Sequence, residues 1–546
     1  MSTPVSINDG PFSSNILLSK KVLLLYFFII WLSFLPLILE IYLFWKIVEN
    51  NYMLFILILP IQICISYIII FFSALLISKF FLIISNIIHK PKEGVFNRKK
   101  SDKDYYFWCL RSIIRKWPIW ITNLTHISFF NNLLLRVFGV KTKFSNSLSN
   151  GKIDCEFIEL GKNVSIGKGS FVKSSMIFQD YLIIKKILIA DNVIIGSQSY
   201  ISPGTEIGEN TSIGAFSVTK LSQKLEPYSI YSGCPAKKYD KNHINIDSMR
   251  LNLESHAYRS ESLEQHYKVI PKKSENIDNI EGKFVKKFYL YLIIFFIIYT
   301  FAYSLPVLIF ISFYISFFQP YILQSSTITE LFIKFESLII FLITPIIIIG
   351  CFLIHLFLLS LITKVFYNYV KHFTPPKEGV YHWNDRDKDY INYFIRSFLI
   401  RYIKWKIQRS PFPWLIKSIF NFIGNCHIGK NTVIEDMYIA KEFLTVGDNT
   451  YLGKLMIANQ LWDKDLTIKG INIKNNVVIS DGTCIAPGTN IENNVSIGPL
   501  SITAKCDNLN SNSIYFSAPI RKINESDLTE LFNLDIKKLI DKKINE

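Results

Sequence analysis

The sequence predicts a membrane protein of mixed class, in which two transmembrane helical hairpins alternate with two all-β domains. Three observations predict it: long apolar blocks, aliphatic residues that return every six positions, and a second occurrence of both features further along the chain. Half of the 546 residues are hydrophobic, yet 19% are charged. That composition is too apolar for an ordinary soluble protein unless the apolar residues are concentrated in membrane spans.

Four apolar blocks are long enough to cross a bilayer, which takes roughly 20 residues. They are Val22–Trp45, Leu54–Ile88, Phe288–Phe318 and Phe335–Val365. Because two short turns join them in pairs, we expect two hairpins, which place all hydrophilic segments on one side of the membrane.

The distribution of lysine and arginine predicts which side that is. The turns at 46–53 and 319–334 are poor in both residues, whereas the opposite ends of the blocks are rich in lysine. By the positive-inside rule we expect a multi-pass cytoplasmic membrane protein with both termini and the β-domains in the cytoplasm. The net charge of +17 then lies mostly at the bilayer surface, and we expect no nucleic-acid partner because no binding motif accompanies it. Eight cysteines without ligand spacing predict no metal site.

The sequence contains an internal repeat. Lys92-Glu-Gly-Val-Phe96 recurs as Lys377-Glu-Gly-Val-Tyr381, and Ser212-Ile-Gly214 recurs as Ser496-Ile-Gly498 at an offset that differs by a single position. Because the offset between matching residues stays almost constant along the chain, the sequence predicts an internal duplication. We therefore divide the chain as follows: N-terminal tail 1–21, hairpin 22–88, aromatic and basic interfacial connector 89–141, β-domain 142–240, linker 241–285, hairpin 286–366, connector 367–424, β-domain 425–523 and C-terminal amphipathic helix 524–546.

The connectors combine tryptophan with arginine and lysine, which suits helices lying at the membrane surface. The alternative is that these side chains pack beneath the β-domains. The tryptophans concerned are Trp108, Trp117, Trp120, Trp405 and Trp414.

The six-residue period of the aliphatic residues predicts a parallel β-helix. Isoleucine stands at 189, 195, 201, 207 and 213, and again at 473, 479, 485, 491 and 497. A short strand plus a turn uses six residues, and three such sides close a coil of about 18 residues with one aliphatic side chain per side pointing inward. Glycine, asparagine and aspartate after the aliphatic residue suit corners with positive φ. Before a break in the register, the second series runs through Ile428, Ile434, Ala440, Val446, Leu452 and Ala458.

The end of the first β-domain resembles a known superfamily. The stretch from Ile189-Ala-Asp-Asn through Ser217-Val-Thr-Lys220 to Gly233-Cys-Pro-Ala-Lys237 is similar to the ending of hexapeptide-repeat acyltransferases. The resemblance implies that each hairpin is followed by a left-handed parallel β-helix (trimeric LpxA-like) domain, with active sites in clefts between neighbouring β-helices.

The larger order of segments resembles the C-terminal membrane region of polylysine-synthetase-type nonribosomal peptide synthetases. This resemblance implies an acyltransferase that moves an acetyl or aminoacyl group from a coenzyme A or phosphopantetheine thioester to an amine or a hydroxyl. It also implies an acyl or aminoacyl carrier protein or an adenylating enzyme as partner, beside the lipid bilayer, and oligomers formed through β-helix packing. The alternative is a noncatalytic scaffold or assembly partner that has lost the motif histidine.

The histidine of the synthetase-type motif is replaced in both units. The matching segments are Met176-Ile-Phe-Gln-Asp180 and Gln460-Leu-Trp-Asp-Lys464, and neither methionine nor glutamine can act as a base. The candidates left are Asp180, Asp463 and His427, each of which could instead be a structural or surface residue. The resemblance implies that the donor phosphates are bound by residues near the end of each β-domain, namely Thr219, Lys220, Lys237 and Lys238, with Lys505 and Lys522 as their counterparts. Without the resemblance, the sequence indicates only surface lysines and a threonine of the coil at these positions.

Overall fold

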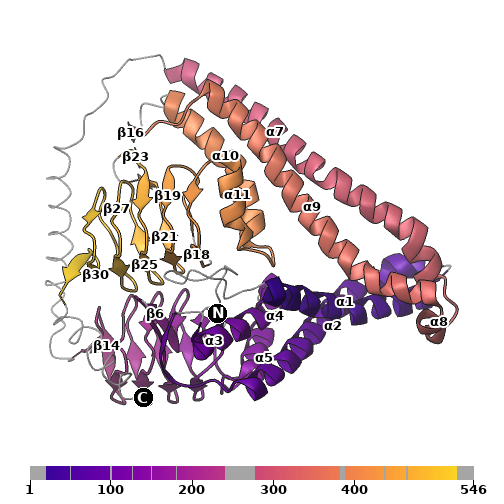
Figure 1. The fold of residues 1–546 in the computed structure, drawn as a ribbon, viewed down its shortest axis with the longest axis horizontal. Coiled ribbons are helices and arrows are strands. Elements are labelled where there is room, and N and C mark those ends of the chain that lie inside the picture. The colour runs from indigo at the N-terminus through magenta and orange to yellow at the C-terminus, as the bar shows by residue number, and fades with distance from the viewer. Residues whose placement is uncertain are drawn as a thin grey trace.

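The computed structural model describes residues 20–239 and 277–524, apart from short gaps at 50, 99–100, 126, 149–150, 180, 382–387, 436–437 and 463–464. Two pairs of long helices carry the apolar blocks (Figure 1). The first pair is α1 (Lys20–Val48) and α2 (Tyr52–Ile88). The second is α7 (Ile277–Phe313), continued by the π-helix η3 (Tyr314–Leu323), and α9 (Phe335–Phe373), with the short α8 (Ile328–Ile333) between them.

Four helical stretches are long and apolar enough to cross a membrane, judged by length and composition. They are Val22–Val48, Tyr52–Ile88, Leu292–Leu323 and Phe335–Phe373. The two helix pairs diverge where they meet the β-structure and converge at their far ends (Figure 1). There the Tyr42 hydroxyl donates to the Ser325 carbonyl at 3.1 Å, and the Trp31 Nε1 donates to the Leu342 carbonyl at 2.7 Å.

Each helix pair is followed by a coil of short parallel strands. The first coil has three ladders. Ladder 1a contains β3 (Ile158–Leu160), β8 (Ile187–Ile189), β11 (Glu206–Ile207) and β13 (Lys224–Leu225). Ladder 1b contains β4 (Ser165–Ile166), β9 (Ile194–Ile195), β12 (Ser212–Ile213) and β14 (Ile230–Ser232), closed by the antiparallel β15 (Lys237–Lys238). Ladder 1c contains β2 (Lys152–Ile153), β5 (Phe171–Val172) and β10 (Tyr200–Ile201).

The second coil repeats this order. Ladder 2a contains β17 (His427–Ile428), β19 (Leu444–Val446), β24 (Ile471–Ile473), β27 (Asn490–Ile491) and β29 (Asn508–Leu509). Ladder 2b contains β18 (Val433–Ile434), β20 (Tyr451–Leu452), β25 (Val478–Ile479), β28 (Ser496–Ile497) and β30 (Ile514–Phe516), closed by the antiparallel β31 (Arg521–Ile523). Ladder 2c contains β21 (Met456–Ile457) and β26 (Cys484–Ile485).

The aliphatic residues of the six-residue series fill the coil interiors. Ile201 and Ile485 have no exposed surface. The corners carry positive φ, as at Asn192 (58°) and at Asn210 (52°), the equivalent corner of the next turn of the coil. One part of the predicted register is wrong. Ile439 and Ile457 are the fully buried inward residues of their sides, so the register stands one residue before Ala440 and Ala458.

Both breaks in the register are β-hairpins. β6 (Ser175–Phe178) pairs with β7 (Tyr181–Ile184), which in turn pairs with β1 (Gly94–Asn97). The same three-stranded arrangement joins β22 (Gln460–Trp462), β23 (Leu466–Ile468) and β16 (Gly379–Tyr381). The Lys-Glu-Gly-aromatic motif is therefore the edge strand that holds each hairpin, and the Glu93 carboxylate accepts a hydrogen bond from the Lys186 amide at 2.9 Å.

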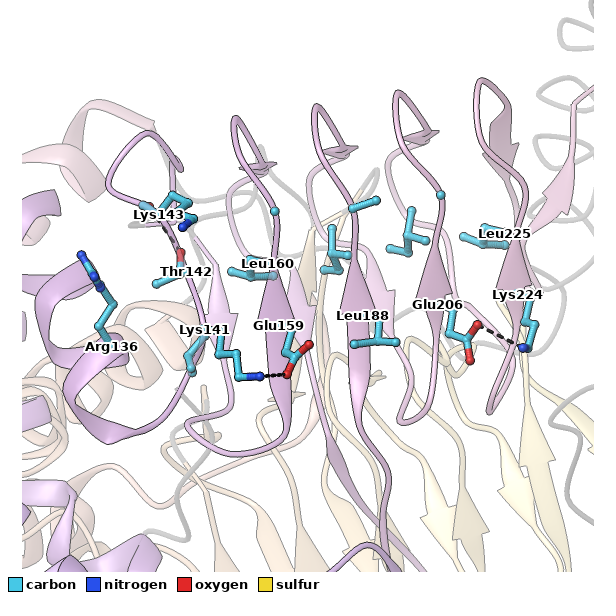
Figure 2. A pocket seen from close by; sticks show the side chains of 16 residues that line it. Arg136, Lys141, Thr142, Lys143, Glu159, Leu160, Leu188, Glu206, Lys224 and Leu225 are labelled. Carbon is cyan, nitrogen blue, oxygen red and sulfur yellow. Dashed lines mark hydrogen bonds and ion pairs between the residues drawn. The ribbon is translucent and has the colours of Figure 1, made fainter.

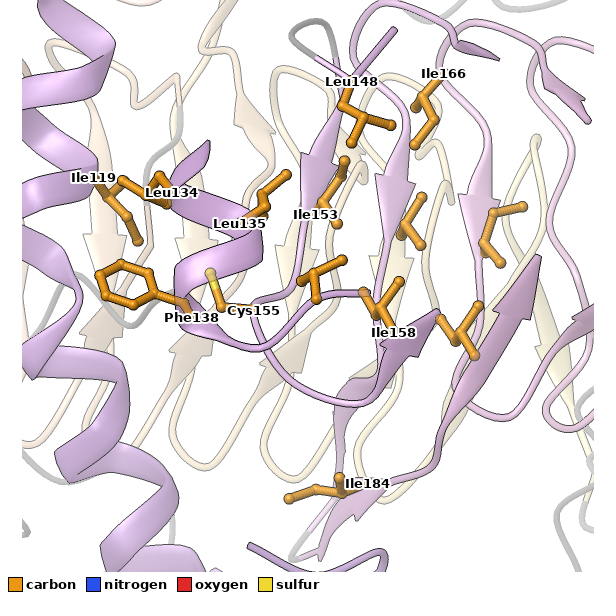
Figure 3. Close-up of a cluster of buried hydrophobic side chains, with 14 of the residues drawn as sticks. Ile119, Leu134, Leu135, Phe138, Leu148, Ile153, Cys155, Ile158, Ile166 and Ile184 are labelled. Carbon is orange, nitrogen blue, oxygen red and sulfur yellow. The ribbon is translucent and has the colours of Figure 1, made fainter. Parts of the chain in front are cut away.

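The connectors are helices that close the first turn of each coil. They form α3 (Lys103–Ile114), α4 (Lys116–Thr125) and α5 (Ser128–Phe138) in the first unit, and α10 (Lys388–Gln408) and α11 (Leu415–Ile423) in the second. Leu134, Leu135 and Phe138 of α5 lie against Ile153 and other inward residues of the coil (Figure 3).

Buried ion pairs fix the connector helices to the coils. Arg111 contacts Glu156 at 2.6 Å, and Arg396 contacts Glu442 at 2.8 Å at the corresponding place in the second unit. Trp117 is buried in this packing, which follows the second of the two alternatives for the connectors, whereas Trp405 is exposed.

The two coils lie side by side (Figure 1). Ladder 1c of the first coil faces ladder 2b of the second, and Phe171, Tyr200 and Val218 share one hydrophobic cluster with Phe516 and Ile523. Several buried charged residues, among them Lys173, Glu435 and Asp481, lie next to this cluster.

Candidate active site between the two coils

A small cavity of about 20 Å³ opens between the coils, beside α3. Residues from both units line it, so neither unit alone forms it. Its lining comprises Trp108, Lys173, Ser175, Met176, Ile177, Tyr200, Glu435, Tyr451, Ser480 and Asp481.

Two buried charged residues reach the cavity from the position directly after an inward aliphatic residue, where several sides of the coils have glycine. Glycine commonly follows the inward aliphatic residue, because a Cβ there meets the next coil; at Gly196 it would lie 2.5 Å from the Ala215 amide. Lys173 and Glu435 stand at this position, and both are buried. Lys173 directly precedes the hairpin of β6 and β7.

An ion pair joins the two coils at the cavity. The Lys173 ammonium lies 2.9 Å from the Asp481 carboxylate, which also accepts a hydrogen bond from the Lys454 amide at 2.7 Å. Burial would raise the pKa of Asp481, but Lys173 and this hydrogen bond hold that pKa below its ordinary value. Burial would lower the pKa of Lys173, but Asp481 and Asp154 outweigh it and raise that pKa. The pair is therefore ionised at neutral pH.

A second carboxylate anchors the hairpin to the first coil. Asp154 accepts hydrogen bonds from the Ser175 amide at 3.1 Å and from the Ser175 hydroxyl at 2.7 Å. Burial raises the pKa of Asp154, against the opposing effect of Lys173. These contacts place Ser175 and Met176 on the wall of the cavity.

Glu435 is the cavity residue suited to proton transfer. Burial raises its pKa to about 8, although the nearby charges of Lys116 and Lys454 oppose that rise. Its Oε2 has no hydrogen-bond partner among the described residues. A carboxylate whose pKa lies close to neutral can take up and release a proton during a reaction, as a general base must.

Two buried basic side chains around the cavity have no hydrogen-bond partners in the described parts of the chain. The Lys116 Nζ stands 5.3 Å from the centre of the Trp414 ring, and burial lowers the Lys116 pKa to about 7. The Arg98 guanidinium lies between the Tyr105 and Tyr451 rings, 5.8 and 5.3 Å from their centres. Both rings offer cation–π stabilisation in place of hydrogen bonds.

Met176 and Gln460, which the sequence led us to expect in place of a motif histidine, occupy different surroundings. Met176 lines the cavity that contains Glu435. Gln460 lies on β22, and its Oε1 is buried with no hydrogen-bond partner among the described residues. Asp180 and Asp463 lie outside the described residues.

His427 lies away from this cavity. It borders a separate groove of about 410 Å³ beside the end of α9, together with Lys371, Glu442 and Thr445. Glu442 is held there by Arg396 and by the Tyr367 hydroxyl at 2.8 Å.

The residues expected to bind the donor lie toward the far ends of the coils. The Thr219 hydroxyl is buried and accepts from the Ser202 amide at 2.8 Å, so it serves the coil itself. Lys237 and Lys238 are exposed on β15, and Lys238 pairs with Glu226; Lys220 is partly buried in a preceding turn. The Lys505 ammonium donates to the Thr467 hydroxyl at 3.1 Å. Lys522 is exposed on β31, beside Ile523, which packs in the same cluster as Met176.

A wider groove of the first coil lies elsewhere, along ladder 1a (Figure 2). It has a volume of about 880 Å³, and its basic residues include Arg136 and Lys143. Lys224 is paired with Glu206 at 3.1 Å, and Lys141 with Glu159 at 2.5 Å, so much of its charge is neutralised. The pKa of Glu159 is lowered by hydrogen bonds from Lys141 and Lys186. Within the described residues, no group of three His, Cys, Asp or Glu could hold a metal ion.

The sequence-based reasoning missed Lys173, Glu435 and Asp481. A signal for the first two was present, because each is a large charged residue at a position where the coils commonly have glycine. Nothing in the sequence indicated that they meet, since the contact depends on how ladder 1c and ladder 2b pack.

Residues 186–220 match the family model described as bacterial transferase hexapeptide (six repeats). The chain therefore contains a hexapeptide-repeat segment in its first coil. A comparison with curated protein sequences found no match.

Solved structures similar to parts of the chain include three acyltransferases. A hexapeptide-repeat acetyltransferase from Vibrio cholerae is 21% identical, over 21% of this chain and 80% of that chain, with a TM-score of 0.17. A maltose O-acetyltransferase from Clostridium difficile 630 is 18% identical, over 27% and 92%, with a TM-score of 0.21. A mutant N-acyltransferase from Bacillus cereus, in complex with dTDP-4-amino-4,6-dideoxyglucose and coenzyme A, is 24% identical, over 21% and 66%, with a TM-score of 0.16.

Proposed function

We propose that this protein is a membrane-embedded acyltransferase whose reaction centre is the cavity between the two coils, with Glu435 as the general base. The observation that carries the proposal is the position of Glu435: a buried carboxylate with a pKa of about 8 shares one cavity with Met176, which stands where the synthetase-type motif has its histidine. A base missing from one unit is thus supplied by the other.

The proposed reaction transfers an acetyl or aminoacyl group from a thioester to an amine or a hydroxyl. Glu435 takes the proton from the acceptor as the acceptor attacks the carbonyl carbon. The Lys173 ammonium and the Tyr200 hydroxyl, which line the same cavity, stabilise the developing oxyanion. When the carbon–sulfur bond breaks, Glu435 returns the proton to the sulfur, so that an amide or ester and a free thiol leave. A volume of about 20 Å³ fits a single water-sized group, such as the nucleophilic end of an acceptor.

The donor in this proposal is coenzyme A or a carrier-bound phosphopantetheine, and its phosphates lie near Lys522 at the far end of the second coil. The remaining parts of the proposal rest on the sequence analysis. The chain consists of two duplicated units, each of which is a transmembrane hairpin followed by a left-handed β-helix. The two units are related to the membrane region of polylysine-synthetase-type enzymes. The β-helices face the cytoplasm, where a carrier protein or an adenylating enzyme supplies the activated acyl group.

The test is acyl transfer by the purified full-length chain in detergent, with radiolabelled acetyl-CoA and with an aminoacyl-loaded carrier protein, against mixed amine and hydroxyl acceptors. We expect Glu435→Gln to reduce transfer at least 100-fold, because a positioned base contributes about 10²–10⁴ in rate. Glu492→Gln is the matched control, since Glu492 follows an inward isoleucine in the same coil but is exposed. We expect it to retain full activity.

Two outcomes would contradict the proposal in different ways. Transfer that survives Glu435→Gln unchanged would remove Glu435 from the mechanism and leave the acyltransferase assignment standing. Absence of transfer together with absence of coenzyme A binding would favour the alternative, a noncatalytic scaffold.

A further inference from the structure

One ladder of the second coil is apolar and uncovered, unlike the other outward faces of that coil. The outward residues of ladder 2c and its adjoining bridges are Tyr438, Met456, Cys484 and Ile502. Met456 is 44% exposed and Ile502 45% exposed. The outward residues of ladder 2a are polar instead, including the hydrogen-bonded row Asn472, Asn490 and Asn508. A row of exposed apolar side chains on consecutive coils indicates an interaction surface.

Ladder 1c of the first coil corresponds to ladder 2c, and its contacts show what kind of surface covers a row of outward apolar side chains. By place in the coil and by sequence offset, Phe171, Tyr200 and Val218 correspond to Met456, Cys484 and Ile502. Phe171 is only 2% exposed, because ladder 2b of the second coil covers it. The corner residue Leu500 packs into the same cluster.

Ladder 2b of the second coil is the face that covers ladder 1c, and its equivalent on the first coil, ladder 1b, is also exposed. In the register of the duplication, Ile194, Phe216 and Ile230 are the counterparts of Val478, Leu500 and Ile514, three apolar residues of the covering face. Ile194 is 55% exposed and Phe216 is 69% exposed, whereas Val478 is 1% exposed. Phe216 also shares the left-handed corner conformation of Leu500, with φ of 54° at both. The chain therefore exposes both halves of an interface that it buries once internally.

We propose that a second copy of this chain docks ladder 1b, with Phe216, onto ladder 2c, in the same way that ladder 2b docks onto ladder 1c within one chain. The contact is head-to-tail, so each copy offers one donor face and one acceptor face. This inference is independent of the proposed enzymatic function, because it rests on exposure and strand correspondence alone.

The direct test is a disulfide cross-link between two differently tagged full-length chains, co-expressed and purified in detergent. One chain carries Met456→Cys and the other Phe216→Cys, the counterparts of Phe171 and Leu500, which share one cluster within the chain, and both carry Cys484→Ser to remove a neighbouring thiol. We expect a cross-linked species that contains both tags. The control pair is Thr445→Cys with Phe216→Cys, because Thr445 points outward from ladder 2a; no cross-link is expected there.

The second measurement is the mass of the protein by light scattering. Ile502→Asp should shift the assembly toward the single chain, while Thr445→Asp should leave the mass unchanged. Because Ile502 is exposed, its replacement should leave the melting temperature of the single chain within a few degrees of the parent, which distinguishes lost docking from lost folding.

Two results would overturn the proposal. The first is a parent protein that remains a single chain at micromolar concentration, together with no cross-link between the thiols at positions 456 and 216. The second is a thiol at position 456 that stays closed to maleimide in the single chain, which would show that a segment of the same chain covers ladder 2c.

Discussion

Lys173 and Glu435 occupy the same kind of position in their coils, yet their charges have different surroundings. Lys173 faces Asp481 at 2.9 Å, so its charge is compensated within the interface. Glu435 has no cation within ion-pair distance among the described residues, and burial keeps its proton on up to about pH 8. The charge of Lys173 therefore has a counter-ion across the interface between the coils, whereas the Glu435 carboxyl has none in the described parts of the chain.

Removal of one partner of the Lys173–Asp481 pair should be strongly destabilising. Lys173→Met leaves the Asp481 carboxylate buried without a counter-ion, and we expect the free energy of unfolding of the coil region to fall by about 3–5 kcal/mol. The double variant Lys173→Met with Asp481→Leu should recover most of that loss, because the carboxylate that faces Lys173 is then removed as well. Denaturant unfolding of both variants in detergent checks this, and a double variant as unstable as the single one would contradict it.

The raised pKa of Glu435 makes the stability of the protein depend on pH. The neutral carboxyl is favoured in the folded chain, so its contribution is fully present below the ordinary pKa of 4.5 and is lost as pH rises through about 8. Glu435→Gln mimics the neutral form at every pH. Its melting temperature relative to the parent should rise from pH 5 to pH 8 and then level off. Glu492→Gln serves as control and should show a constant difference over that range.

At the scale of elements, the coils depend on corners that the sequence marks clearly. Asn494 has φ of 60° and belongs to a row in which it accepts from Asn476 and donates to Asn512. Asparagine suits such corners because it tolerates the left-handed region and its amide side chain can bond to the coils on either side.

Two substitutions at Asn494 separate the backbone from the side chain. Both Asn494→Gly and Asn494→Ala remove the amide ladder, but only alanine meets the steric penalty of positive φ. We expect alanine to be less stable than glycine by about 1–2 kcal/mol. The comparison of their unfolding midpoints checks this, and equal midpoints would show that the corner relaxes out of the left-handed region.

The same local signals explain how far the sequence could predict the fold. Inward isoleucines return on every side of the coil and corner asparagines on successive turns, so the coils can be inferred from the sequence alone. The shift to Ile439 and Ile457 could not be inferred in this way, because an alanine and its isoleucine neighbour fit the register almost equally well. The pairing of the Lys-Glu-Gly strand β1 with β7 could not be inferred from the sequence either, because α3, α4 and α5 all lie between these two strands in the chain.

At the scale of the whole molecule, the candidate site arises from packing between units. Met176 was identified from the sequence as the residue in place of a histidine, but Glu435 lies in the other coil, beyond the second helix pair. Periodicity within one coil carries no information about which faces of two coils meet. Sites built from single segments can be found by pattern, whereas this one requires the arrangement of the domains.

The sidedness of the molecule can be tested by thiol labelling. If the lysine-rich helix ends face the cytoplasm, the short turn between α1 and α2 lies outside, and Tyr52, which is 85% exposed, is the first residue of α2 directly after that turn. In a chain with Cys64→Ser, Tyr52→Cys should react with a membrane-impermeant maleimide in intact cells. Lys224→Cys is the matched probe on the first coil, where the lysine side chain is 77% exposed. It should react only after the cells are permeabilised, and its labelling in intact cells would place the coils on the outside and reverse the assigned orientation.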